Sequence, residues 1–256
     1  MQGPSHLIIS WFVAEACGVK SPRDRRIVAL SGLAPDIDSL AYVGAIVYFR
    51  FDKDLAFEHV WEVVHHRYTH GLGFVVLTGI VAFLILTRFS FPGVGRRNDV
   101  AAGPGSRAGR VALLCMLVSA IHVFCDVVAG GPTWPVFPAW PLSDLAWSLD
   151  WSWTLGEWPN SVILFACLAG TMLYARVAGY SPMESINYGV ERWFVRIIEH
   201  GSDIPPEESQ GTDTRAVGKW KSARIRILVY GLLIMLVIAI LVPLGFDLGK
   251  LNFPNF

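Results

Sequence analysis

Long apolar stretches separated by short polar segments dominate the chain. A helix that spans a bilayer needs about 20 mostly apolar residues, and residues 111–130, 161–178 and 227–246 meet that length. Residues 72–87 are slightly shorter but carry no charge. The pattern therefore predicts an all-α, polytopic membrane protein with about four clear spanning helices.

Two stretches near the N-terminus are apolar but interrupted. Residues 7–19 contain one glutamate, and residues 27–49 are broken by Pro35 and two aspartates. Proline removes a helical hydrogen bond, and a carboxylate is costly against lipid unless it faces protein or water. We therefore expect short membrane-associated helices here, with a break and a new helix from about Ser39.

Composition supports lipid as the main surroundings of the chain. Hydrophobic residues make up 53% of the sequence and charged residues 16%, whereas soluble domains carry about 25% charged residues. The formal net charge is zero, so nothing favours nucleic acid as a partner. The four cysteines lie in apolar stretches without CxxC spacing, which favours packing.

Loop charges predict the orientation of the chain. The loop of residues 88–110 has five arginines against one acid, whereas the loop of residues 131–160 has no Lys or Arg. Basic loops stay in the cytoplasm, so the second loop is expected outside. We predict a membrane-embedded domain in residues 1–178, a cytoplasmic and partly disordered segment in residues 179–226, and a transmembrane helix in residues 227–246.

This topology would bring the ionisable residues of the apolar segments to one membrane face. His122 and Asp126 are four positions apart on an apolar helix, so their side chains share one side of it. That spacing suits two ligands of one metal ion, and ionisable groups within spans are usually functional. A hydrogen-bonded pair that joins helices is the alternative.

A second cluster of histidines precedes the span of residues 72–87. Helical spacing pairs His66 with His70, whereas His65 reaches His70 only on an irregular backbone. Neutral imidazoles suit zinc or a similar metal. The adjacent Arg67 would suit an anionic group such as phosphate, because its guanidinium can bind two oxygens at once.

The remaining candidates are weaker when each is taken alone. Asp36 or Asp38 would serve as a helix cap, although carboxylates together with histidines also suit a hydrolytic metal site. His6, at the start of an apolar helix, is uninformative by itself. The Trp- and Pro-rich loop of residues 130–159 is expected to anchor the protein at the bilayer interface, with a lid over a site as the alternative.

Four motifs in order resemble the YdjM-like family of predicted membrane-bound metal-dependent hydrolases. They are PSHLIIS, LAPDIDS, HHRYTHGL, and IHVFCDVVAGGPTWPVFP followed by PLSDLAWSLDW, and they cover roughly residues 1–160. By that resemblance, the presumed metal-site positions are His6, Asp36, Asp38, His65, His70, His122 and Asp126. The family block usually reads His-Arg-Gly, whereas here His65 is followed by His66 and Arg67. Distance to His70 favours His65 as the ligand and helical spacing favours His66, so both are kept.

The expected function is a membrane-bound hydrolase that uses a divalent metal, with zinc expected, near the non-cytoplasmic face of the inner or plasma membrane. Its substrate would be a phosphoester or other ester that is membrane-associated or lipid-linked. A His-xxx-Asp helix is also similar to zinc-dependent phospholipases C, which suggests phosphoester hydrolysis. The alternative is a structural or regulatory membrane protein with a structural metal site or interhelical polar contacts. An open pocket beside the ligands would favour catalysis, and a closed coordination shell the alternative.

Overall fold

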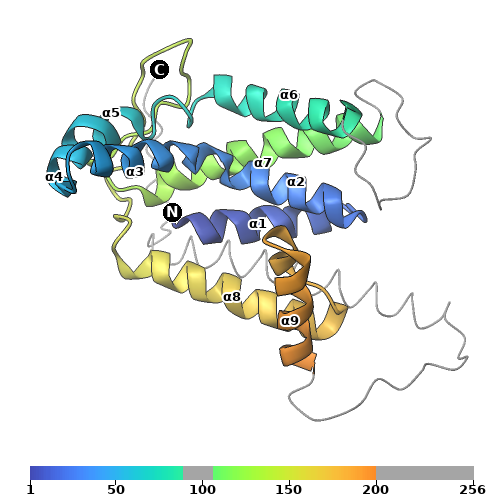
Figure 1. Ribbon diagram of the computed structural model, residues 1–256. Coiled ribbons are helices and arrows are strands. Elements are labelled where there is room, and N and C mark those ends of the chain that lie inside the picture. Colours follow the sequence, from blue (N-terminus) through green and yellow to red (C-terminus); the bar gives the residue numbers. More distant parts are fainter. Residues whose placement is uncertain (89–105, 200–256) are drawn as a thin grey trace, which may run out of the picture.

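The computed structural model describes residues 1–88 and 106–199, and these residues form helices joined by loops (Figure 1). The elements in chain order are α1 (Gly3–Ala16), α2 (Pro22–Leu33), η1 (Ala34–Asp38), α3 (Ser39–Tyr48), α4 (Lys53–Ala56), η2 (Phe57–Trp61), α5 (Glu62–Val64), α6 (Leu72–Arg88), α7 (Arg107–Ala129), α8 (Trp158–Ala178), η3 (Pro182–Ser185) and α9 (Tyr188–Glu199). Within these residues the only β-type pairing is one bridge between Val136 and Trp147. The all-α prediction is confirmed.

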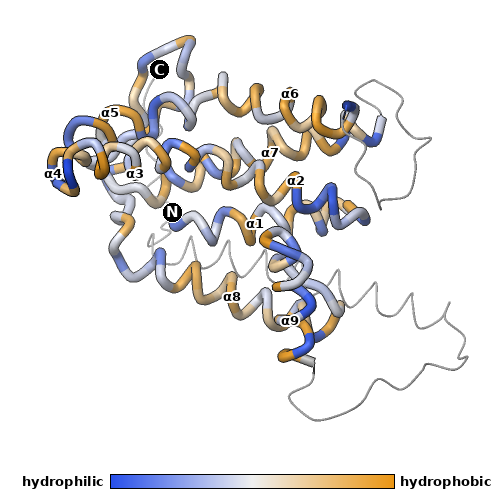
Figure 2. Tube along the Cα trace, viewed as in Figure 1, coloured by the Kyte–Doolittle hydropathy of each residue, from blue (hydrophilic) through white to orange (hydrophobic). Residues whose placement is uncertain are grey.

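Three helical segments are long and apolar enough to cross a membrane: Pro22–Tyr48, Arg107–Ala129 and Trp158–Ala178. The shorter α6 is also apolar, and Figure 2 shows the hydrophobic positions along these helices. These elements are consistent with the predicted number of about four spans. The span predicted for residues 227–246 lies outside the described residues, as do most of the basic loop and all of residues 200–226.

The predicted break near Pro35 is present, but it does not end the helical segment. α2 passes through the 3-10 turn η1 directly into α3, which begins at Ser39 as expected. The tighter turn places its two aspartates without the regular spacing of an α-helix. α1 begins earlier than the apolar stretch predicted, because Pro4 fits the first turn of a helix.

Helices α1, α2, α6, α7 and α8 run roughly side by side, and α9 crosses them (Figure 1). α2 packs against both α1 and α7, and α6 packs on α7. Glycines allow close approach at two of these contacts. A Cβ at Gly32 would lie 1.7 Å from Oγ of Ser10, and one at Gly79 would lie 2.3 Å from Cγ of Met116. Small residues bring helices together in this way in membrane proteins.

The segment after α8 folds back onto the bundle through η3 and α9. Glu184 of η3 accepts hydrogen bonds from Arg25 (Nε to Oε1, 2.6 Å; Nη2 to Oε2, 3.0 Å) and from Nε1 of Trp11 (2.7 Å). Tyr180 donates to Oε1 of Glu15 at 2.9 Å. These buried contacts attach η3, and α9 after it, to the first two helices.

Candidate metal centre

Eight of the predicted site residues lie at one end of the bundle, although they come from four separate segments. They lie at the start of α1, in η1, in the turn before α6 and near the end of α7: His6, Asp36, Asp38, His65, His66, His70, His122 and Asp126. All are buried except Asp36, whose side chain is 20% exposed. The chain thus collects imidazoles and carboxylates from distant positions in an apolar bundle.

The innermost group is Asp36, His70, His122 and Asp126, each of which offers one ligand atom within 4.8 Å of the others. Oδ2 of Asp126 lies 2.9 Å from Nε2 of His122 and 3.3 Å from Nε2 of His70. The two Nε2 atoms are 3.2 Å apart. We call these four residues the metal cluster, because two nitrogens and two carboxylates that converge in this way fit a zinc-like cation.

Backbone and hydroxyl groups orient the two imidazoles of the metal cluster. Nδ1 of His122 donates to the carbonyl of Gly32 at 2.7 Å, so its Nε2 faces the cluster. Nδ1 of His70 lies 3.1 Å from Oγ1 of Thr69, so its Nε2 also faces inward. Metal-binding histidines are commonly held through the second nitrogen in this way.

A second group of possible ligands is His65, His66 and His70, whose ligand atoms also lie within 4.8 Å of one another. Asp38 lies behind these rings. Its Oδ1 accepts from Nδ1 of His65 at 2.9 Å, and its Oδ2 accepts from Oγ1 of Thr69 at 2.7 Å. This geometry suits a carboxylate that positions a histidine as well as it suits the predicted direct ligand.

His66 adopts an uncommon backbone conformation. Its φ is +66°, in the left-handed region that costs a residue with a side chain about 1 kcal/mol. The side chain is buried, and its Nδ1 has no hydrogen-bond partner among the described residues. Burial lowers the pKa of His66 well below its usual range and also lowers the pKa of His70. Two neutral rings are thus available as ligands, and both His65 and His66 remain candidates.

His6 contacts the metal cluster from α1. Its ring stacks on that of His122, with centroids 3.6 Å apart and planes 23° apart. Its Nε2 lies 3.2 Å from Oδ1 of Asp126, and the amino group of Met1 contacts the same oxygen. Asp126 therefore contacts partners from α1, α7 and the turn before α6, which makes it the centre of the arrangement.

Arg67 is the one predicted residue whose side chain is engaged elsewhere. Its guanidinium binds Oδ1 of Asp144 at 2.9 Å and lies over the ring of Phe137 at 5.2 Å. Its side chain is 38% exposed. The predicted role of Arg67 toward an anionic substrate group stays a prediction.

The Trp- and Pro-rich loop contacts the site and also carries exposed tryptophans. The ring of Trp134 lies 5.3 Å from that of His65 and 5.1 Å from that of His66, measured between centroids. Phe137 donates its backbone N–H to the carbonyl of His66 at 3.1 Å. Exposed tryptophans of this region are Trp147, Trp151 and Trp158. The loop thus contacts the site, as a lid would, and carries exposed tryptophans, as an anchor at the bilayer interface would.

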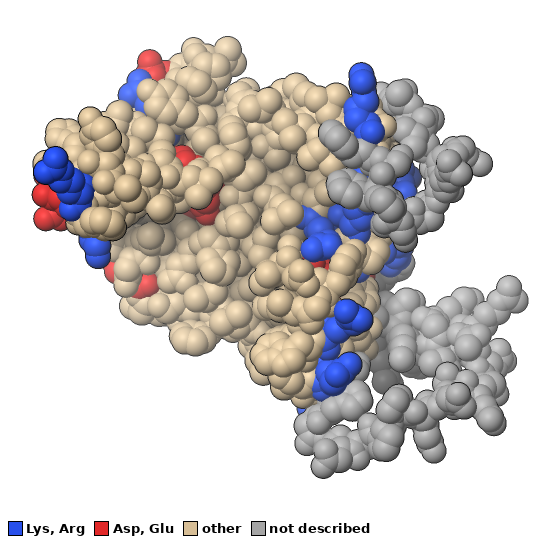
Figure 3. Space-filling model, viewed as in Figure 1, with Lys and Arg blue, Asp and Glu red and all other residues tan. Residues whose placement is uncertain are grey.

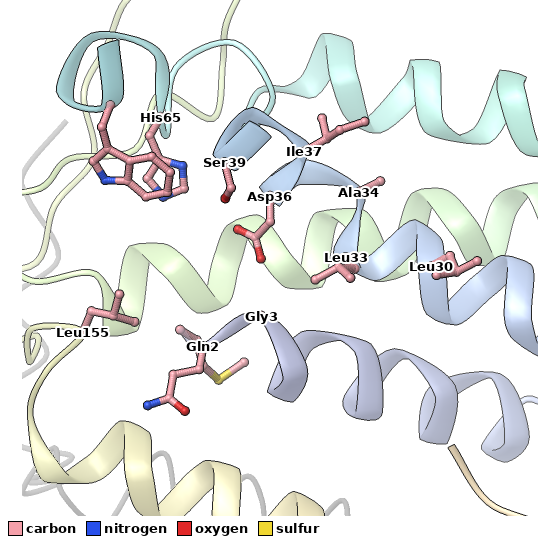
Figure 4. A pocket seen from close by; sticks show the side chains of 12 residues that line it. Gln2, Gly3, Leu30, Leu33, Ala34, Asp36, Ile37, Ser39, His65 and Leu155 are labelled. Atoms are coloured by element: carbon pink, nitrogen blue, oxygen red, sulfur yellow. The ribbon is translucent and has the colours of Figure 1, made fainter. Parts of the chain in front are cut away.

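A cavity of about 730 Å³ adjoins the cluster, and Asp36 and His65 lie in its wall. In Figure 4 the carboxylate of Asp36 points into the space between η1 and the start of α1. This volume is within the range of small-molecule sites. The metal cluster is therefore buried on most sides but reachable through Asp36.

Basic side chains gather at the opposite end of the bundle. Figure 3 shows Lys and Arg concentrated near α9 and the start of α2, whereas both signs of charge occur near α4. The arginines involved are those of α2, α7 and α9 that are not buried: 23, 26, 107, 110, 192 and 196. The His and Asp residues and the basic surface thus mark two different ends of the apolar helices.

Comparison with known proteins gives a family but no relative of described activity. A search of curated proteins found no match, and a search of solved structures found none. A family model described as YdjM inner membrane protein matches residues 1–200, which include every helix given above. The apolar helices agree with a membrane location. This chain is therefore a member of the YdjM inner membrane protein family.

Proposed function

We propose that the protein is a membrane-bound, metal-dependent hydrolase that cleaves an ester of a membrane-associated substrate. The observation that carries this proposal is the cavity beside Asp36, because it joins a buried set of metal-ligand side chains to the outside. Structural metal sites are closed, whereas catalytic sites keep a position accessible. Phosphoesters are the first substrate class to test.

Asp36, His70, His122 and Asp126 would hold a divalent cation, and their nitrogen and oxygen donors favour zinc. When bound, such an ion supplies Lewis acidity, which lowers the pKa of water and stabilises negative charge on the ester. His70 belongs to both groups of ligands, so a second ion next to His65 and His66 is a further part of the proposal.

The residues of the chain have distinct tasks in this hydrolysis. The carbonyl of Gly32 and the hydroxyl of Thr69 hold the imidazoles with Nε2 inward. Asp36 faces the cavity, so the ester reaches the cluster from that side. Water adds to the phosphorus or carbonyl carbon, the bond to the leaving oxygen breaks, and that oxygen takes a proton. Arg67 contacts Asp144 through Nη2 alone, so its other N–H groups can bind an anionic group of the substrate.

The rival function is a structural or regulatory membrane protein. The contact of 2.9 Å between His122 and Asp126 also fits a polar contact that stabilises the bundle. This rival gives no reason for the cavity beside Asp36.

The test combines elemental analysis with a substrate screen. Protein purified in detergent is expected to contain divalent metal in about molar proportion and to hydrolyse at least one phosphoester or carboxylic ester. A chelator should abolish turnover, and zinc or another divalent ion should restore it. Stoichiometric metal without turnover of either ester class would favour the structural rival. Protein without metal, both before and after incubation with it, would contradict the site itself.

We also propose that the metal cluster lies toward the non-cytoplasmic face, because the basic end of the bundle suits the cytoplasm. Cys17 is exposed and lies at the end of α1 away from His6, so it reports on the basic end. A membrane-impermeant maleimide added to intact cells should label the variant Asp150→Cys, in the outer loop, and leave Cys17 unreacted. The reverse pattern would invert the orientation.

A further inference from the structure

The cavity beside Asp36 continues as an apolar groove. Its wall on α2 and η1 is formed by Leu30, Leu33, Ala34 and Ile37, and the start of α1 lies opposite. Figure 4 shows Leu33 and then Leu30, both of which precede Asp36 in the chain, on the α2 side of Asp36. The groove therefore reaches the metal cluster at Asp36, and its wall along α2 consists of apolar side chains.

The apolar wall is open on the outer side of the bundle. Leu30 is 50% exposed and Ile37 is 55% exposed. Both belong to the segment Pro22–Tyr48, which is long and apolar enough to cross a membrane. Apolar side chains exposed on a spanning segment face lipid tails, since lipid is the solvent at that depth. A hydrocarbon chain can therefore enter this groove from the bilayer without passing through water.

The polar groups of the groove lie beside the metal cluster, away from its wall on α2. Asp36, Gln2 and Ser39 line this part together with Trp61 and Leu155, whereas Leu30 and Leu33 line the part along α2 (Figure 4). A molecule with a polar linkage at one end and a hydrocarbon chain at the other matches this distribution. Small-molecule sites commonly combine an apolar wall with a few polar groups that fix orientation. A polar, water-soluble ester would have no apolar part to pack against Leu30 and Leu33.

We propose that the groove binds one acyl chain of a membrane lipid and places the ester linkage of that lipid beside Asp36. The substrate class is then a lipid ester that enters laterally from the bilayer. The cleavage rests on the proposed hydrolase function, whereas the binding of the chain rests on the groove alone. The two parts therefore need separate measurements.

The binding is tested by photolabelling of the full chain in phosphatidylcholine vesicles. These contain a small fraction of phosphatidylglycerol with a diazirine at the end of one acyl chain. Labelling should concentrate on residues 30–37. Leu33→Trp fills the groove and should lower this labelling about fivefold or more. Leu113→Trp is the matched control, because Leu113 is 55% exposed on α7 and lies outside the groove; it should leave the labelling unchanged.

The cleavage is tested on the same proteins. Leu33→Trp should slow hydrolysis of a long-chain lipid ester more than that of a short water-soluble ester, with the metal content unchanged, whereas Leu113→Trp should slow neither reaction. Ala34→Phe serves as a second groove-filling variant if Leu33→Trp fails to fold, as judged by gel filtration in detergent. Equal labelling of all exposed helices, with no change in either groove variant, would overturn the groove. Groove labelling without turnover of any ester would support the lipid site and overturn the hydrolase.

Discussion

The bundle contains two buried polar clusters of different construction. One, the arginine cluster, consists of Arg25, Glu15 and Glu184 and ties η3 to the first two helices. Its guanidinium makes two hydrogen bonds to Glu184 and lies 3.5 Å from Glu15. In this cluster a side chain of the protein, Arg25, supplies the positive charge that faces the two carboxylates.

The metal cluster satisfies its carboxylates differently. Asp36 and Asp126 face imidazole nitrogens, two of which, on His70 and His122, are 3.2 Å apart, and Asp126 also contacts the amino group of Met1. Burying a carboxylate is costly unless a cation or hydrogen bonds compensate for the lost water. The imidazole and carboxylate atoms of the metal cluster converge on one point. A cation bound from solution can therefore accept an electron pair from each of them. Both clusters are buried, so burial alone does not mark a candidate functional site. Convergent ligand atoms beside a cavity distinguish the metal cluster from the arginine cluster.

The largest expected effect is that of Asp126→Ala. Because Asp126 contacts His6, His70 and His122, its loss should lower bound metal to less than about a tenth of the wild-type content and abolish hydrolysis. Elemental analysis and an ester assay check this. Asp150→Ala, in the exposed loop, is the control and should change neither. Full metal content in Asp126→Ala would remove the distinction between the two clusters.

Glu184→Gln should affect stability and spare the metal. The substitution keeps the shape of the side chain but leaves Arg25 with Glu15 as its remaining carboxylate partner in the arginine cluster. We expect the free energy of unfolding to fall by about 3 kcal/mol, measured by denaturation in mixed detergent. Metal per folded molecule should stay at the wild-type value. Glu58→Gln, at an exposed position, is the control, and a parallel loss of metal in Glu184→Gln would mean that the clusters are coupled.

Asp38→Ala distinguishes a positioning carboxylate from a direct ligand. If Asp38 acts by holding His65, its removal should weaken metal binding about 10- to 100-fold, as for other carboxylates behind a metal-binding histidine. Metal competition with a chelator of known affinity measures this. Asp54→Ala, at an exposed position, should leave the affinity unchanged. A loss as complete as that of Asp126→Ala would instead make Asp38 a ligand.

The smallest expected change in free energy is that of His66→Gly. Glycine accepts a positive φ without strain, but the variant also loses the packing of the buried His66 ring on Trp134. The relief of about 1 kcal/mol of strain is therefore offset, and the net change in the free energy of unfolding of the metal-free protein should be small. The bound metal should decrease if His66 is a ligand. Arg50→Gly is a matched control, since Arg50 has a φ of +54° away from the cluster, and it should leave the metal unchanged. An unchanged metal content in His66→Gly would leave His65 as the ligand.

Several features of the fold followed from short stretches of sequence. The spans of α7 and α8 are recognisable from length and hydropathy, and the turn at Pro35 follows from the missing N–H of proline. The helical spacing of His122 and Asp126 put both on one side of α7. These properties are local, so a single segment contains the information for each.

Other features depended on segments that are distant in the sequence. The bond of Arg67 to Asp144 and the place of Asp38 behind His65 require three different segments to pack. The helix α9 was not predicted, and η3 before it is attached by the contact of Glu184 with Arg25. Hydropathy does not encode such pairings.

By itself, the sequence determined that this chain is helical and resides in a membrane. Its apolar segments are long and poor in charge, and in lipid the backbone of such a segment must form its hydrogen bonds within a helix. It also supplied the candidate ligand residues. Only the tertiary structure decided that these residues meet at one end, that Asp36 opens onto a cavity, and that an apolar groove continues from it. The reason is that ligand convergence and cavities arise from the relative placement of helices, which packing across the whole bundle sets.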